Sequence, residues 1–497
     1  MSLDERWPVI YLRGYAGNQK GVEQTVDDPF YGFNAGSTHV RVGPRGTATF
    51  FAFEGAVIRL FTDHEYRDAY DTGVQRLDPG GDRPPMASIW IHRYYDATSE
   101  TFDRPSEPRR WGIEEAAADL ARLIDDVLAA TGAPKVYLVG HSTGGLIIRS
   151  LLQRHYPMAG RAGADVVAKV FTYGTPHAGI HFRDPIGPPL EWLRDQFGWN
   201  NMPDFGRERM YRYLTPDAEQ QDEVPDDFEP RSLAGAFPAE RVFCLVGTDA
   251  ADYGAPKHAV GPRSDGLVQI ESAYVKDAPR AYVHRAHSGR YGIVNSESGY
   301  ANLERFFFGD VRVNLSLDGL SAIAEPAPRD AEVYHHLDVT VSLRALPVVL
   351  HEQSGDHYCP VPLEWRKGRE GEPIFLFSLF LIPARSRTGV MRYAVSLAVH
   401  RIERRDSPLW LADHLEKIPL WTDNLLVDLT PDEEIGYRPF YAWRSQMPQP
   451  DAAPEGALDV EDRGNGTSVV RIPLPAPARA VLGDEATLVV DAGWWRV

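Results

Sequence analysis

The stretch VYLVGHSTGGLIIRSLL, residues Val136–Leu152, carries a buried strand directly into a helix. Between the two lies Gly140-His141-Ser142-Thr143-Gly144, which leaves no room for a relaxed loop. Glycines two residues on either side of Ser142 allow the strand and the helix to approach each other without a clash. We therefore expect the serine hydroxyl above the edge of a sheet, beside the free N–H groups of a helix N-terminus, where it can act as a nucleophile.

Around this stretch, short apolar runs alternate with helical patterns up to about residue 310. Strands are expected at residues 7–14, 87–96, 135–140, 168–174, 241–247 and 278–287, and helices at 112–131, from about 143 and at 297–308. Alternation of this kind, with nearly continuous apolar strands, predicts an α/β fold whose mostly parallel sheet is covered by helices on both faces. We assign residues 1–310 to this domain. Residues 180–238 form a long insertion, which predicts a lid or cap.

Beyond residue 311 the pattern changes to a period of two. Apolar and polar residues alternate over 311–317, 337–343, 392–402 and 486–492, with turn residues between these segments. This pattern predicts that residues 311–497 form an antiparallel β-sandwich domain. A chain of 497 residues also exceeds what one hydrophobic core usually serves, so two domains are expected.

The composition excludes several classes of partner. A formal net charge of -18 argues against nucleic acid. The longest apolar run, residues 374–382, is far shorter than the roughly 20 residues of a membrane-spanning helix, so no integral membrane segment is predicted. The first residues do not resemble a signal peptide, which predicts a cytoplasmic protein and leaves export of a processed form open. No spacing of histidine, cysteine and aspartate predicts a metal site, no cofactor is expected, and the oligomeric state is not predicted.

A nucleophilic serine needs a base, and the base needs an orienting carboxylate. After a nucleophile on a strand–turn–helix, the chain order is serine, acid, histidine. The segment that follows the strand at 241–247 offers Asp249, Asp252 and Asp265, and the histidines further on are His258, His284 and His287. His258 precedes Asp265, so the chain order rejects it as the base if Asp265 is the acid.

Four motifs resemble those of the α/β-hydrolase superfamily, in its lipase and esterase branch. They are GHSTGG at 140–145, GTPHAG at 174–179, SDGLV at 264–268 and HSGRYGIVNSE at 287–297. The resemblance covers residues 1–310 and implies a catalytic triad of Ser142, Asp265 and His287. Asp249 remains the second choice for the acid, and His284 is the alternative base.

The same resemblance places the oxyanion hole at the backbone N–H groups of Tyr15 and Thr143. Arg13 departs from the family pattern, because lipases commonly have histidine at this position. The side chains expected to line the substrate pocket are His141, Leu190, Trp192 and Phe197.

Together these motifs imply a serine hydrolase that cleaves carboxylic esters through an acyl-enzyme. Its substrate would be a small-molecule, lipid or polymer ester. One alternative is an acyltransferase or amidase with the same triad. An alternative of another class is a catalytically inert binding or scaffold protein that acts through its β-sandwich.

Overall fold

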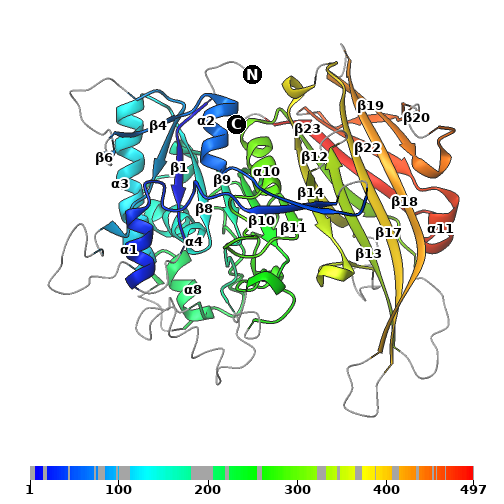
Figure 1. Ribbon diagram of the computed structural model, residues 1–497, viewed down its shortest axis with the longest axis horizontal. Coiled ribbons are helices and arrows are strands. Elements are labelled where there is room, and N and C mark those ends of the chain that lie inside the picture. Colours follow the sequence, from blue (N-terminus) through cyan, green and yellow to red (C-terminus); the bar gives the residue numbers. More distant parts are fainter. Residues whose placement is uncertain are drawn as a thin grey trace. The chain divides into compact units, whose positions relative to one another are not determined.

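The computed structural model describes residues 6–495 apart from 15–18, 43–44, 72–73, 76–83, 97–98, 100–111, 181–204, 219–222, 254–259, 322–331, 344–347, 364–371, 387, 406–413, 433–435, 450–452, 455 and 465. The chain divides into two compact units (Figure 1). One comprises Met1–Arg280 and His284–Leu303, and the other comprises Ala281–Val283 and Glu304–Val497. The domain limits expected at residues 310 and 311 stay a prediction.

A seven-stranded sheet forms the centre of the α/β part, in the order β11-β10-β9-β8-β1-β7-β4. Its strands are β1 (Val9–Leu12), β4 (Arg67–Asp68), β7 (Ser88–Ile91), β8 (Val136–His141), β9 (Val167–Tyr173), β10 (Val242–Gly247) and β11 (Arg280–Val283). Pairing from β4 through to β10 is parallel. Strands β1, β7, β9 and β10 are buried along their whole length, as expected for a parallel sheet covered on both faces. The predicted α/β fold is confirmed.

The helices of this part also follow the sequence pattern. They include α1 (Gln19–Asp27), α2 (Ala56–His64), α3 (Ile113–Thr131), α4 (Thr143–Ser150), α8 (Arg207–Leu214) and α10 (Glu297–Phe308). At the start of α3, the Gly112 N–H donates to Glu115 Oε2 at 3.2 Å, and the helix ends at Gly132, whose φ of 72° suits glycine. The apolar stripe of α3, which includes Leu120, Ile124 and Val127, is buried.

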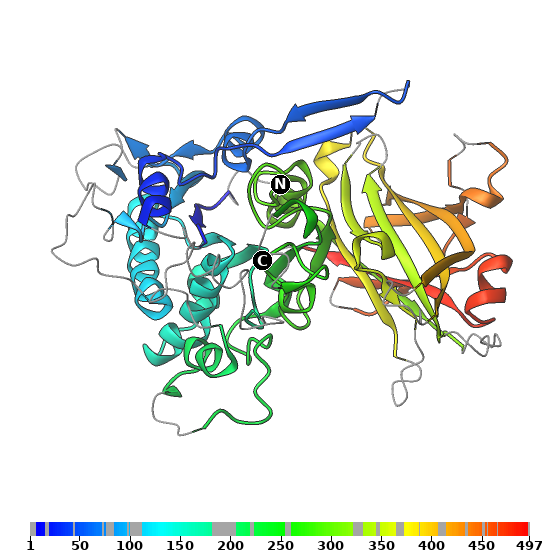
Figure 2. The same ribbon diagram turned by 60° about the horizontal axis from the view of Figure 1, so that its bottom comes forward.

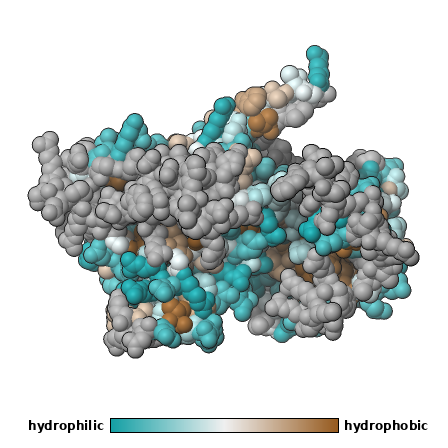
Figure 3. Space-filling view, turned by 90° about the horizontal axis from the view of Figure 1, so that it is seen from below, coloured by the Kyte–Doolittle hydropathy of each residue, from teal (hydrophilic) through white to brown (hydrophobic). Residues whose placement is uncertain are grey.

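A hairpin in the segment between β1 and β7 was not predicted. It consists of β2 (Thr38–Val42) and β3 (Ala48–Ala52), and it extends as an arm (Figure 2). Its Val40 and Phe50 side chains are 48% and 58% exposed. In the space-filling view of Figure 3, an arm that bears apolar residues projects from the surface. None of the described helices has both the length and the apolar composition needed to cross a bilayer.

Two antiparallel sheets make up the second unit, which confirms the predicted β-rich fold of this region. One has the order β16-β12-β23-β22-β21 and the other β14-β13-β17-β18-β19-β20, with β15 also paired to β13. The strands are β12 (Val311–Asp318), β13 (Glu332–Leu343), β14 (Val349–Gln353), β15 (Val361–Pro362), β16 (Ile374–Leu381), β17 (Met391–Arg405), β18 (His414–Asp432), β19 (Gly436–Trp443), β20 (Gly456–Ala457), β21 (Val460–Asp462), β22 (Thr467–Pro473) and β23 (Thr487–Trp494). Buried and half-buried residues alternate strictly along β12.

Strand β18 is long, yet its sequence did not predict it. It contains Pro419, which lies opposite His400 in β17, where the register shifts between Val399 and His400. A bulge is one of the few places in a sheet that tolerates proline, because the ladder hydrogen bond is already interrupted there. Pro419 therefore interrupts the pattern from which a strand would be predicted.

Candidate active site

The turn between β8 and α4 holds Ser142 in a strained backbone conformation, with φ 54° and ψ −127°. A positive φ is unusual for a residue other than glycine, and such strain persists only where the surroundings enforce it. Here the Ser142 N–H donates to the Tyr173 carbonyl at 2.9 Å, and Thr175 Oγ1 donates to the Ser142 carbonyl at 3.0 Å. The end of β9 and the residues after it therefore hold the serine in this conformation.

Close backbone approaches explain the glycines around this turn. A Cβ on Gly144 would lie 2.5 Å from the Leu12 carbonyl oxygen, and one on Gly145 would lie 2.1 Å from Thr175 Oγ1. A Cβ on Gly14 would lie 2.4 Å from Ser142 Cβ. Each distance is too short for any side chain, so these glycines allow β1, the turn and the start of α4 to meet at Ser142.

The structure brings Ser142, His287 and Asp265 together in one chain of contacts. His287 Nε2 lies 3.0 Å from Ser142 Oγ, and His287 Nδ1 lies 2.7 Å from Asp265 Oδ2. The other carboxylate oxygen, Oδ1, accepts the N–H groups of Leu267 at 3.0 Å and Val268 at 2.8 Å. Both Asp265 and His287 are buried. An ionised carboxylate can only accept, so Nδ1 must carry the proton and Nε2 presents its lone pair to the serine hydroxyl.

Two further glycines leave space for this arrangement. A Cβ on Gly174 would lie 2.8 Å from Asp265 Oδ2 and 3.2 Å from His287 Nδ1. A Cβ on Gly247 would lie 2.7 Å from Asp265 Cβ. Gly174 opens the GTPHAG motif and has a φ of 49°, so the first glycine of this motif is explained by clearance for the buried pair.

Residues 79–313 match the family model described as alpha/beta hydrolase fold. This part of the chain has the alpha/beta hydrolase fold. The match agrees with the parallel sheet order and with the strand–serine–helix turn described above. The resemblance inferred from the four motifs is therefore confirmed at the level of the fold.

Two curated relatives are similar to a short part of the chain. Over 72 residues it is 45% identical to a triacylglycerol lipase of Pseudarthrobacter phenanthrenivorans, and over 72 residues 45% identical to one of Burkholderia plantarii. Each match covers 14% of this chain and 20% or 18% of the relative, so the chain matches about a fifth of the length of these lipases.

Two solved structures are similar at low sequence identity. The Bacillus licheniformis lipase BlEst2 in its mature form is 14% identical, with 59% of this chain and 88% of that chain covered and a TM-score of 0.29. Phospholipase PlaB from Legionella pneumophila is 11% identical, with 83% of this chain and 91% of that chain covered and a TM-score of 0.32.

Two aromatic residues of the hydrolase fold flank the His287 ring. His141 Nε2 donates to the His287 carbonyl at 3.0 Å, and the two ring centroids are 4.9 Å apart. Burial, with the nearby His287 and Arg13, holds the pKa of His141 well below its usual range, so its ring is neutral and does not repel a charged His287. The structure shows His141 bound to the His287 backbone, and its predicted place in the lining of the substrate pocket stays a prediction.

Tyr253 packs against His287 and was not predicted. Its ring meets the imidazole edge to face, with centroids 5.6 Å apart and an interplanar angle of 75°. Burial raises the pKa of Tyr253 to about 12, so the phenol stays neutral beside the imidazole. It lies twelve positions before Asp265 in the sequence, and its residue type gave no signal of a role.

The second choices for acid and base lie elsewhere. His284 directly follows β11, and its side chain is exposed. The imidazole in contact with Ser142 Oγ is that of His287. Asp249 is buried, and its Oδ1 accepts the N–H of Asp252 at 3.2 Å, which is a turn-capping contact. His258 lies outside the described residues.

The oxyanion-hole prediction is only partly covered by the described residues. Thr143 is the first residue of α4, directly after the serine. Tyr15 lies outside the described residues, as do the pocket residues Leu190, Trp192 and Phe197. Two hydrogen bonds fix the loop residues before Tyr15. Arg13 Nη1 donates to the Tyr31 carbonyl at 2.5 Å, and Tyr95 Oη donates to the Gly14 carbonyl at 3.2 Å. Arg13, the departure from the family pattern, thus anchors this loop.

Proposed function

We propose that the chain is a carboxylic ester hydrolase that works through an acyl-enzyme on Ser142. The observation that carries this proposal is the pair of contacts at His287, 3.0 Å from its Nε2 to Ser142 Oγ and 2.7 Å from its Nδ1 to Asp265 Oδ2. These distances are within hydrogen-bond reach on both sides of one imidazole, as general-base activation of a serine requires.

The proposed reaction has two steps. His287 Nε2 takes the Ser142 proton while Oγ attacks the ester carbonyl, and the collapse of the tetrahedral intermediate passes this proton to the leaving alcohol. Asp265 keeps the proton of the ring on Nδ1 and stabilises the imidazolium. Water, activated by the same histidine, then attacks the acyl-enzyme and releases the acid. The backbone N–H groups of Thr143 and Tyr15 stabilise the oxyanion in both steps.

An ester substrate is favoured over other acyl donors by the short matches to two triacylglycerol lipases. Whether the natural substrate is a small-molecule, lipid or polymer ester is answered by a panel of p-nitrophenyl esters from acetate to palmitate, with polymer esters added. Including an alcohol in the same assay separates hydrolysis from acyl transfer, because a transferase would form the new ester in place of the free acid.

The decisive test uses Ser142→Ala with a matched serine control. Ser150 is the last residue of α4, the helix that begins directly after Ser142, and it is buried. Its Oγ has no hydrogen-bond partner among the described residues, so Ser150→Ala removes a hydroxyl without changing the turn at Ser142. We expect Ser142→Ala to abolish fluorophosphonate labelling and to lower turnover about 10³-fold or more. Ser150→Ala should retain both. Turnover by Ser142→Ala close to that of the wild type would reject the nucleophile, and an unlabelled wild-type chain would favour the inert scaffold alternative.

A further inference from the structure

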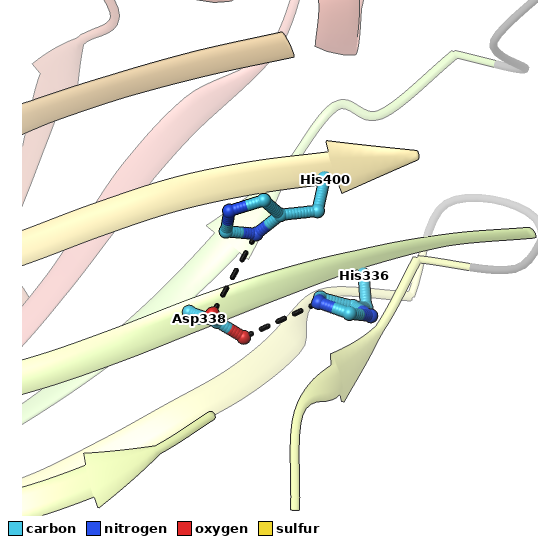
Figure 4. A group of neighbouring side chains, drawn as sticks. All are labelled: His336, Asp338 and His400. Atoms are coloured by element: carbon cyan, nitrogen blue, oxygen red, sulfur yellow. Dashed lines mark ion pairs between the residues drawn. The ribbon is translucent and has the colours of Figure 1, made fainter. Parts of the chain in front are cut away.

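Three polar side chains of the second unit converge on one face of its larger sheet. His336 and Asp338 are two residues apart on β13, so they point to the same face. His400 on β17 pairs directly with His336. Figure 4 shows the Asp338 carboxylate between the two imidazole rings. The sequence analysis predicted no metal site, because the two histidines come from strands that are far apart in the chain.

The contacts in this cluster are ion-pair contacts that are longer than charge-assisted hydrogen bonds. His336 Nε2 lies 3.4 Å from Asp338 Oδ1, and His400 Nδ1 lies 3.5 Å from Asp338 Oδ2. Charge-assisted hydrogen bonds between such groups are typically about 2.7–2.9 Å long. Both ring nitrogens are buried, and neither has a hydrogen-bond partner among the described residues. A buried polar atom without a hydrogen-bond partner costs free energy, so each of the two nitrogens is available to bind a ligand.

The same distances suit ligands that share one ion. One donor atom of each of the three residues lies within 4.8 Å of the other two. Two ligands of a tetrahedral ion, each bonded at roughly 2.0–2.1 Å, are about 3.3–3.4 Å apart. The separations of 3.4 Å from His336 Nε2 to Oδ1 and 3.5 Å from His400 Nδ1 to Oδ2 are close to this value, so each oxygen of the Asp338 carboxylate lies at ligand spacing from one imidazole.

The surroundings hold the carboxylate and leave space at the histidine. Asp338 Oδ1 accepts the Gly355 N–H at 2.8 Å, and Asp338 Oδ2 lies 3.1 Å from Lys417 Nζ. Lys417 is shared with Asp356, also at 3.1 Å, so its single charge faces two carboxylates. A Cβ on Gly355 would lie 2.9 Å from His336 Nε2, so the glycine keeps the space beside this nitrogen open. Outer contacts of this kind orient the ligands of metal sites.

We propose that His336 Nε2, His400 Nδ1 and the Asp338 carboxylate bind a divalent transition-metal ion, with zinc as the representative. Two imidazoles and one carboxylate suit zinc and its neighbours, whereas magnesium and calcium prefer oxygen ligands alone. The ion would join β13 to β17, and its role would be to stabilise the second unit. This proposed metal site is independent of the proposed ester hydrolysis.

The test uses the full chain, freed of metal with a chelator and dialysed, and titrated with zinc chloride in a calorimeter. We expect one zinc ion to bind at this site, and His336→Gln and His400→Gln each to weaken its binding by roughly 100-fold or more, since even loss of an outer contact costs about 10–100-fold. His335→Gln is the matched control, because this neighbour on β13 points to the opposite face of the sheet. It should bind zinc as the wild type does.

Two further measurements guard against a misfolded variant. Gly355→Ala keeps all three ligands but places a methyl group beside His336 Nε2, so it should also weaken zinc binding. At zinc about 100-fold above its Kd, the Tm of the wild type should rise by about 5 °C, and those of the two glutamine variants should not. Equal zinc affinity and stoichiometry in the wild type and all three cluster variants, or no zinc binding by the wild type, would overturn the proposal. Ester hydrolysis, measured in parallel, should be unchanged in every variant.

Discussion

Replacing Asp265 with asparagine tests how the carboxylate acts on the candidate base. Asp265 Oδ1 accepts two backbone N–H groups, from Leu267 and Val268, while Oδ2 faces His287 Nδ1. In Asp265→Asn the amide oxygen will take the Oδ1 position, because an NH₂ group there would confront two N–H donors. The amide NH₂ then faces Nδ1, which must accept a hydrogen bond. The ring proton moves to Nε2, and Nε2 can no longer take the proton of Ser142.

The size of the effect follows from the two backbone contacts. Turning the amide to restore the productive tautomer leaves two buried N–H groups unpaired, at about 1–3 kcal/mol each. The productive arrangement is thus disfavoured by about 2–6 kcal/mol, which corresponds to a fall in kcat between about 30-fold and about 3 × 10⁴-fold. KM should change little, because the substitution is buried and removes no substrate contact.

The assay is the initial rate of p-nitrophenyl acetate hydrolysis, with the rate of fluorophosphonate labelling as a second readout. Circular dichroism and Tm check the fold, which should persist because asparagine can keep both backbone hydrogen bonds. Asp249→Asn is the matched control, since Asp249 is also buried and follows β10 but caps a turn through Asp252. If Asp265→Asn retained kcat within about fivefold of the wild type while Asp249→Asn lost it, the tautomer argument would be refuted and the acid reassigned.

Three other substitutions or conditions test the surroundings of the site. Gly14→Ala places a methyl group 2.4 Å from Ser142 Cβ, so kcat/KM for p-nitrophenyl acetate should fall about 100-fold, the effect of a displacement near 1 Å. An unaffected rate would show that the loop yields freely. Arg149→Met should lower the free energy of unfolding in urea by about 3 kcal/mol, because it leaves two carbonyls without their donor and removes one of the two donors of a third. The first two are the carbonyls of His177 at 2.9 Å and Pro230 at 2.7 Å, and the third is that of Ser232 at 2.7 Å, which also accepts from Gln153 Nε2 at 3.1 Å. Burial lowers the pKa of His141 and His177, so the unfolded chain binds more protons. The free energy of unfolding is therefore unaffected by these two histidines above about pH 6.5. Below this pH it falls, by up to about 1.4 kcal/mol per pH unit for each histidine. Unfolding curves from pH 8 to pH 5 that show no such decline would contradict this assignment.

Much of the fold could be predicted because the signals for it are local. The apolar runs and helical stripes placed β8, β9, β10 and α3 to within a few residues, and the strict alternation over 311–317 placed β12. Where a local signal was broken, the prediction failed. Pro419 obscured β18, and a polar segment that contains Val40 and Phe50 concealed the hairpin of β2 and β3.

The sequence by itself determined the serine turn, because Gly140, Ser142 and Gly144 act on neighbouring backbone atoms. It limited the acid and the base to a few residues by chain order, and only the family resemblance favoured Asp265 and His287 among them. The tertiary structure decided which imidazole lies against the serine, since Ser142 and His287 are 145 positions apart and their contact depends on how whole strands and loops pack. The same reason applies to Tyr253 beside His287 and to His400 opposite His336. Local patterns specify the elements, whereas long-range packing specifies which side chains meet.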